Sequence, residues 1–314
     1  MPVTLEQARQ NAADALDVTV IDEFRTNSLL DLITFDDVVN PAGGGATLTY
    51  GYRRLAELSD AAFRAINTEY APSEVSTTRH TVELKVLGGA YQVDRVLGKV
   101  GPAASGEVAL QMQQKIRAVQ AEFGNAVING DSAVNEDSFD GLSKALAGST
   151  TEVADGYDWS AGTGEEGAFT VLEDLDTFLA LLDGEPGAIV TNRLVIAKIA
   201  SAARRANMYV QEVGPRSTRI GSYGGIRLVD AGKKAGTNED VIPATGGAAD
   251  MYAIRFGLDG FHGVSTAGGS LVSQFAPDFT TPGAVKTGEV EMGPVAVALK
   301  KTKAAAVARG VKIA

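Results

Sequence analysis

One long amphipathic helix, set between β-rich segments, constrains the fold of this chain most strongly. From Ser105 to Asn129 the apolar residues recur at a 3.6-residue period and form one stripe: Met112, Ile116, Val119, Phe123 and Val127. Ser105 can cap the start, and Gly130 is typical of the position after a helix end. Such a helix would be roughly 37 Å long. A long helix with one narrow stripe indicates a spine that braces sheets, and not a helix enclosed by a compact enzyme core.

Length and composition limit the class of protein further. The chain has 314 residues, close to the upper limit for one hydrophobic core, so we expect two subdomains. It has no cysteine, which excludes disulfides, thiolate nucleophiles and Cys-ligated metals. Residues 1–7 lack the basic and apolar regions of a signal peptide, and no apolar run reaches the roughly 20 residues of a membrane span. We expect assembly in a reducing cytoplasm and no membrane partner.

The charge distribution leaves two interpretations open. The net charge of −11, without a dense basic cluster, argues against a protein that grips nucleic acid by its phosphates. Acidic residues are concentrated in residues 1–40 and basic residues in 285–314. This asymmetry favours head-to-tail association between copies, but two solvated ends that never meet would give the same pattern.

Residues 46–97 are expected to form a long β-hairpin. Apolar residues alternate with polar ones on the outgoing and the returning run: Leu48, Tyr50 and Tyr52, then Val82, Leu84 and Val86, continuing to Tyr91 and Val93. About 25 mostly polar residues separate the runs, and a loop of that length usually has a function. We expect its tip to lie on another subunit.

The rest of the chain indicates an α+β protein. Residues 1–40 are expected to be an arm that begins with a capping box at Thr4–Gln7, followed by a hinge at 41–45. Residues 168–260 are expected to be an α/β unit. Its helices should run from a capping box at Thr170 to Gly184, and from the Asn192 cap to Arg205. The remaining expected strands are 188–190, 226–229, 251–256, 271–275, 290–300 and 303–313.

This order of parts resembles the HK97-fold major capsid proteins of tailed bacteriophages. The segments that carry the resemblance are 89–97, 123–130, 139–142, 187–192, 251–260 and 293–297. It implies an α+β, HK97-like capsid fold in five parts. These are an N-terminal arm (1–45), an E-loop hairpin with adjoining strands (46–97), a P-domain with the spine helix and following loop (98–167), an A-domain (168–262), and C-terminal β strands returning to the P-domain (263–314).

The resemblance implies a structural role. The chain would self-assemble as pentamers and hexamers into an icosahedral phage head, a virion capsid built in the bacterial host cytoplasm. The head would enclose double-stranded DNA without sequence-specific binding; scaffolding, portal and decoration proteins are further partners that the family allows. We expect no enzyme activity, catalytic residue, cofactor or metal site. The candidate subunit contacts are Leu29, Leu30, Leu32, Ile33 and Phe35 on the arm, and Arg53, Arg54 and Arg64 on the hairpin. The arginines would pair with acids of a neighbouring copy, or simply be solvated.

The sequence departs from the family in two respects. In some members, neighbouring subunits are cross-linked covalently between an E-loop lysine and an asparagine of another subunit. Here the first lysine is Lys85, beyond the hairpin tip, and the tip carries arginines, whose guanidinium is no nucleophile at neutral pH. We therefore predict no self-catalysed isopeptide bond. Some members begin with a scaffolding segment of about a hundred residues that is later cut away. Here only some 40 residues precede the expected hairpin, so scaffolding would be separate or unnecessary.

Two rival functions stay open, an encapsulin shell that holds cargo enzymes and a soluble α/β enzyme. The acidic arm and the long hairpin favour the virus over the encapsulin. Gly162–Gly167 matches the dinucleotide fingerprint, but no strand precedes it and its two glutamates would repel a pyrophosphate. Asp131–Asp137 only partly matches a calcium loop, because several ligand positions are missing. His80 and His262 lack metal-ligand spacing and are interpreted as packing or surface residues.

Overall fold

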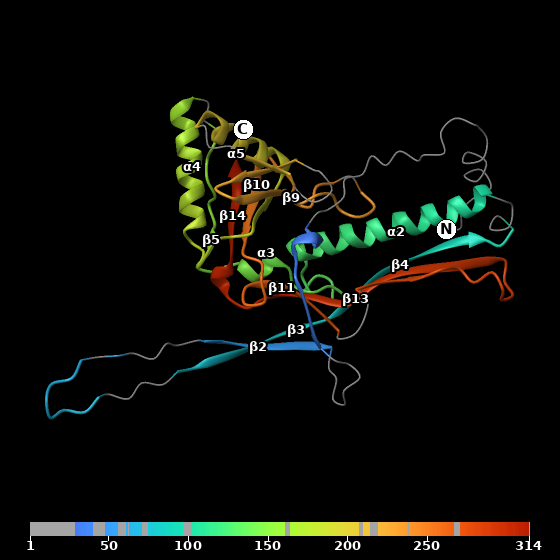
Figure 1. The fold of residues 1–314 in the computed structure, drawn as a ribbon, viewed down its shortest axis with the longest axis horizontal. Coiled ribbons are helices and arrows are strands. Elements are labelled where there is room, and N and C mark those ends of the chain that lie inside the picture. The colour runs from blue at the N-terminus through green and yellow to red at the C-terminus, as the bar shows by residue number, and fades with distance from the viewer. Residues whose placement is uncertain are drawn as a thin grey trace.

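The structure is a computed structural model that describes residues 29–39, 48–55, 61, 63–70, 75–96, 102–160, 164–206, 210–213, 219–237, 239–266 and 271–313. Figure 1 shows a long helix lying along two long strands, a sheet with further helices at the other end of the body, and a hairpin that projects away from both. The expected capping box at Thr4–Gln7 and the hinge at 41–45 lie outside the described residues. No described helix is long and apolar enough to span a membrane.

The long helix α2 spans Pro102–Asn129, three residues longer at its start than expected. Proline is well suited to a first helical position, where its missing N–H is not needed. Val119, Phe123 and Val127 are buried, and the other two stripe residues pack against the core, which confirms the single apolar face. The helix ends where only glycine fits, since a Cβ on Gly130 would lie 2.3 Å from the Phe139 carbonyl oxygen.

A five-stranded sheet lies against α2. Its strands are β1 (Phe35–Val39), β4 (Lys85–Asp94), β11 (Phe261–Thr266), β12 (Val272–Phe275) and β13 (Val285–Leu299). The long strand β13 pairs with β11, β12 and β4 at different parts of its length. Tyr91 and Val93 of β4 are buried. Gly288 of β13 gives the Tyr91 ring its space, because a Cβ there would lie 2.4 Å from that ring.

A second sheet has seven strands in the order β5-β14-β10-β6-β9-β8-β7. Their bounds are β5 Glu152–Val153, β6 Ala188–Thr191, β7 Val210–Val213, β8 Arg219–Tyr223, β9 Ile226–Asp230, β10 Ala248–Ile254 and β14 Ala305–Lys312. Strand β6 is central and completely buried, which explains its unbroken apolar run. The helices of this unit are α3 (Leu142–Leu146), α4 (Glu165–Leu179) and α5 (Arg193–Arg205).

The two longer helices of this unit begin differently. The Asn192 side chain accepts a hydrogen bond from the Leu194 N–H at 3.0 Å, which confirms the predicted cap of α5. The capping box predicted at Thr170 is wrong, because α4 already begins at Glu165 and the Thr170 hydroxyl donates to the Glu166 carbonyl inside the helix. Two glutamates in the first turn complement the helix dipole and support the earlier start.

The C-terminal strands, expected to return together, are divided between the two sheets. Strands β12 and β13 lie in the five-stranded sheet, whereas β14 pairs with β10 in the seven-stranded sheet. A short 3-10 turn, η4 (Thr302–Ala304), redirects the chain between them. One continuous hydrophobic core spans both sheets, so β13 and β14 couple the two halves of the body.

The hairpin has strands β2 (Thr49–Leu55) and β3 (Thr77–Glu83), paired antiparallel with Tyr52 opposite His80. The sequence predicts one alternating return strand, but the structure has two that meet at Leu84. Leu84 is buried, and the alternation reverses after it, so Val86 is 56% exposed and does not share the face of Val82 and Leu84. The reversal arises because the chain leaves β2 at this point and begins to pair with β13.

The described end of the arm packs on the chain's own body. A 3-10 turn, η1 (Leu30–Leu32), leads into β1, which pairs parallel with β11. Leu29 and Ile33 are buried in the core. The Phe35 ring lies 5.9 Å from the Phe123 ring of α2 and fills the space over Gly263, where a Cβ would lie 2.5 Å from it. This segment is therefore part of the folded unit.

Candidate subunit-contact site

The hairpin is held at its root by side chains of β2. The Tyr52 hydroxyl donates to the Leu299 carbonyl at 2.9 Å, and the Arg54 Nε donates to the Lys300 carbonyl at 3.0 Å. Arg54 also donates to the Leu299 carbonyl, and its guanidinium lies 5.6 Å from the centre of the Tyr52 ring. Arg54, expected as a subunit contact, thus fastens the hairpin to the end of β13 in the same chain.

Aromatic rings and both histidines of the chain surround this root. Tyr52 stacks on His80 at 5.6 Å, and Tyr50 meets His262 edge-on at 5.8 Å. Burial raises the pKa of Tyr52 and lowers the pKa of His80, on which the Arg54 charge acts in the same direction. The two histidines are 182 positions apart, so their shared location could not be read from sequence spacing. His80 is half-buried, and His262 is completely buried.

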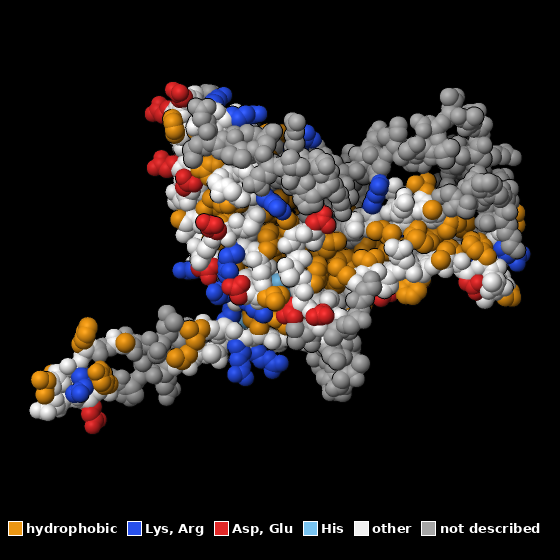
Figure 2. All heavy atoms as spheres, in the orientation of Figure 1, with side chains coloured by type: hydrophobic (Ala, Val, Ile, Leu, Met, Phe, Trp, Pro, Cys, Tyr) orange, Lys and Arg blue, Asp and Glu red, His pale blue; other side chains and the backbone are white. Residues whose placement is uncertain are grey.

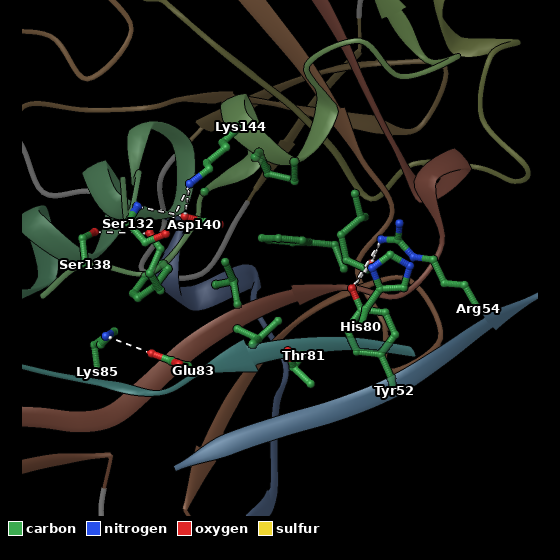
Figure 3. A pocket seen from close by; sticks show the side chains of 18 residues that line it. Tyr52, Arg54, His80, Thr81, Glu83, Lys85, Ser132, Ser138, Asp140 and Lys144 are labelled. Atoms are coloured by element: carbon green, nitrogen blue, oxygen red, sulfur yellow. Dashed lines mark hydrogen bonds and ion pairs between the residues drawn. The ribbon is translucent and has the colours of Figure 1, made fainter. Parts of the chain in front are cut away.

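A cavity of ≈ 610 Å³ lies between the hairpin root and the loop that follows α2 (Figure 3). On the loop side, the Lys144 Nζ lies 2.6 Å from Asp131 and 2.9 Å from Asp140, and 3.2 Å from the Ser132 hydroxyl. The hydrogen bond from Lys144 holds the pKa of the Asp131 carboxyl below its usual range. In this loop, which partly matches a calcium site, an ammonium therefore takes the position between the carboxylates. The described residues contain no group of three or more His, Asp and Glu side chains placed to hold a metal.

Beyond the root, the hairpin extends far from the body and presents large apolar side chains to solvent (Figures 1 and 2). The exposed ones are Leu55, Phe63, Ile66, Tyr70 and Val75. Arg64 donates to the Thr68 carbonyl at 2.9 Å, and its guanidinium lies 5.3 Å from the centre of the Tyr70 ring. The sequence patterns do not single out these residues, because the segment is mostly polar. They are recognised as candidate contacts because the hairpin holds them too far from the body for the chain to bury them.

The other predicted contact residues fall into two groups. Leu29 and Ile33 are buried in the chain's own core, whereas Leu30, Leu32 and Phe35 pack against that core and stay partly exposed. Arg53 is exposed on β2 directly opposite Arg79 of β3, and neither forms an ion pair with a described residue. Like charges in a cross-strand pair repel each other, so this pair favours an anionic neighbour. Of the eight predicted residues, Arg53 and Arg64 are exposed, and both lie on the hairpin.

The glycine-rich fingerprint is only partly described. Gly164 is the N-cap of α4, and Glu165 and Glu166 occupy the first turn, where they oppose anion binding at this helix end. The preceding residues 161–163 lie outside the described part of the chain.

Comparisons with solved structures give matches along nearly the whole chain. The holo-SrpI encapsulin complex from Synechococcus elongatus PCC 7942 matches with a TM-score of 0.67 and 15% identity, over 99% of this chain and 97% of that one. The capsid of an empty GTA particle matches with a TM-score of 0.61 and 15% identity, over 99% and 98%. A structure from Mycobacterium phage Ogopogo matches with a TM-score of 0.61 and 13% identity, over 98% and 99%. No protein-family model and no curated protein sequence matches the chain.

Proposed function

We propose, starting from the HK97-like capsid fold that these similarities show, that the chain is the major capsid protein of a tailed bacteriophage. Copies would assemble as pentamers and hexamers into a closed icosahedral head around double-stranded DNA. The DNA would be held by confinement, which is compatible with the net charge of −11. Residues 168–262 would gather at the symmetry axes, and the five-stranded sheet with α2 would form the remainder of the tile.

The projecting hairpin carries this proposal. A monomer leaves the apolar side chains of its tip in water, and Ile66 is 90% exposed. Each such side chain that becomes buried contributes roughly 1.5–3 kcal/mol before ordering costs. A long, anchored arm with an apolar tip is suited to lie across a neighbouring copy, where many identical contacts add up over a shell.

An encapsulin shell is the second candidate, and a specific observation favours it. The match to the encapsulin complex has a TM-score of 0.67 and covers 97% of that chain. The two candidates differ in what the particle encloses, DNA in one and cargo enzymes in the other. The test is to isolate particles from cells that express this chain together with the genes next to its own. A phage capsid would contain nuclease-protected DNA, and an encapsulin would contain co-purifying protein.

The hairpin tip can be tested directly. We expect Phe63→Ser with Ile66→Ser to abolish particle assembly while the circular dichroism spectrum of the protein stays unchanged, because both side chains are exposed and make no core contact. Val134→Ser is the matched control, since Val134 is 86% exposed in a loop of the body. Normal particles from the tip variant would show that the hairpin is not a subunit contact.

A further inference from the structure

The two longer helices of the seven-stranded unit carry opposite charges. Every charged residue of α4 is acidic, and every charged residue of α5 is basic. Both helices bury one apolar face in the core and turn the other face to solvent. A solvated helix face in a soluble protein usually mixes both signs of charge, so this segregation calls for a physical reason.

The outer face of α4 is an acidic stripe with an apolar centre. Glu166, Phe169 and Glu173 follow each other at spacings of three and four residues, which places them on one side of the helix. All three are exposed, and Phe169 is exposed to 58%. Figure 2 shows the acidic and hydrophobic side chains along α4 at the left edge of the molecule.

The outer face of α5 is a basic stripe, the counterpart of the acidic stripe on α4. Leu194 is 56% exposed and lies between the basic residues Arg193 and Lys198 on the solvent side of the helix. Val195 and Ile199 on the opposite side are buried. Each helix therefore presents one large apolar side chain, and the charged residues of that helix all have the same sign.

Four of these charges have no ion-pair partner in the part of the chain that the structure describes. They are Glu166, Glu173, Arg193 and Lys198, which pair neither with one another nor with another described residue. Where the two helices meet, the Arg205 Nη1 donates to the carbonyl of Gly164 at 3.3 Å, at the end of α5 and the start of α4. The two stripes are left facing outward.

We propose that the acidic stripe of α4 in one copy docks on the basic stripe of α5 in a second copy, with Phe169 and Leu194 buried at the contact. This inference rests on the proposed shell function and names one of its contacts. The partner is a second copy because the chain itself carries both complementary faces. Copies with a net charge of −11 repel each other at long range, so a local match of opposite charges also fixes how they approach.

Charge reversal in the full chain tests the contact. The first variant is Glu166→Lys with Glu173→Lys, and the second is Arg193→Glu with Lys198→Glu. A third carries all four changes, which restores opposite charges with their positions exchanged. Glu136→Lys with Asp137→Lys, in an exposed loop, is the control with the same change of net charge as the first variant. Assembly is followed by light scattering and electron microscopy at about 0.1 M salt, where exposed charges still interact.

We expect each single-helix reversal to raise the protein concentration needed for particles by roughly tenfold or more. The variant with all four changes should assemble at close to the native concentration. The contact would be overturned if the two single-helix variants assembled as well as the loop control. It would also be overturned if the variant with all four changes assembled as poorly as the single-helix variants. In either case particles of the native protein would leave the shell function standing. A native protein that forms no particle would instead count against the shell function itself.

Discussion

At the scale of single residues, Arg309 joins two strands of the seven-stranded sheet and the helix α3 through one guanidinium. Its nitrogens lie 2.9 Å from Glu152 of β5, 3.2 Å from Asp250 of β10 and 2.8 Å from the hydroxyl and the carbonyl of Ser143 in α3. The bonds from Arg309 and from the Gly148 N–H lower the pKa of the Glu152 carboxyl. Glu152 therefore stabilises the folded protein at a pH above the pKa that its carboxyl has in the unfolded chain. This stabilisation is lost as the pH falls through the lower pKa of the folded state.

Replacing Arg309 should destabilise the unassembled protein. We expect Arg309→Met to lower the free energy of unfolding by about 2–4 kcal/mol, because Glu152 and Asp250 lose a partly buried partner. Urea unfolding at neutral pH measures the change. Lys312→Met is the control, since its ion pair with Asp158 is long at 3.7 Å and exposed, and should change stability by less than about 0.5 kcal/mol. Equal effects of the two substitutions would contradict the central role of Arg309.

His262 should make stability depend on pH. It is completely buried, with Asp36 of β1, Tyr50 of β2 and Lys300 after β13 around it, and burial followed by the Lys300 charge lowers its pKa. Because the folded protein disfavours the charged ring, its contribution is complete above about pH 6.5 and is lost as the pH falls toward the lowered pKa. We expect His262→Gln to flatten the decline in urea stability between about pH 7 and 5. An unchanged decline would assign it to other groups.

At the scale of elements, β1 depends on a missing side chain in β11. Gly263→Ala would place a methyl group 2.5 Å from the Phe35 ring. We expect a loss of about 1–3 kcal/mol from overpacking and faster amide hydrogen exchange in β1. Gly89→Ala in the same sheet is the control, since its Cβ would make only ordinary contacts with the Lys115 side chain, at 3.5 Å. Unchanged exchange in β1 would mean that Phe35 does not hold this strand in place.

The elements also show what sequence patterns can and cannot predict. The stripe of α2, the Asn192 cap and the buried run of β6 follow from local periodicity and composition, and each is present. The sequence pattern places the start of α4 too late, at Thr170. The first turn contains two glutamates, which are not part of the apolar periodicity from which the helix is predicted. The parity reversal at Leu84 depends on which partner strand the chain pairs with, and that choice is made by segments distant in sequence. The same holds for the root contacts of Tyr52 and Arg54, whose acceptors are carbonyls some 245 residues away.

At the scale of the whole molecule, we expect no covalent link between copies. Lys85 lies at the base of the hairpin beside Glu83, at 3.2 Å, and no lysine lies in the tip. Particles dissolved in denaturant should therefore release only single chains, which run as one band of monomer mass on a denaturing gel. A ladder of higher bands that persists in denaturant and reducing agent would contradict this prediction.

The shell-type fold, the anchored hairpin with its apolar tip and the opposed charges of α4 and α5 all lead to one claim, that copies of this chain close into a shell. Electron microscopy of the purified recombinant protein after size-exclusion chromatography tests it most directly. We expect hollow closed particles, or free pentamers and hexamers that close into particles as concentration and salt are varied. A stable monomer under all these conditions, also with candidate scaffolding proteins present, would contradict the claim.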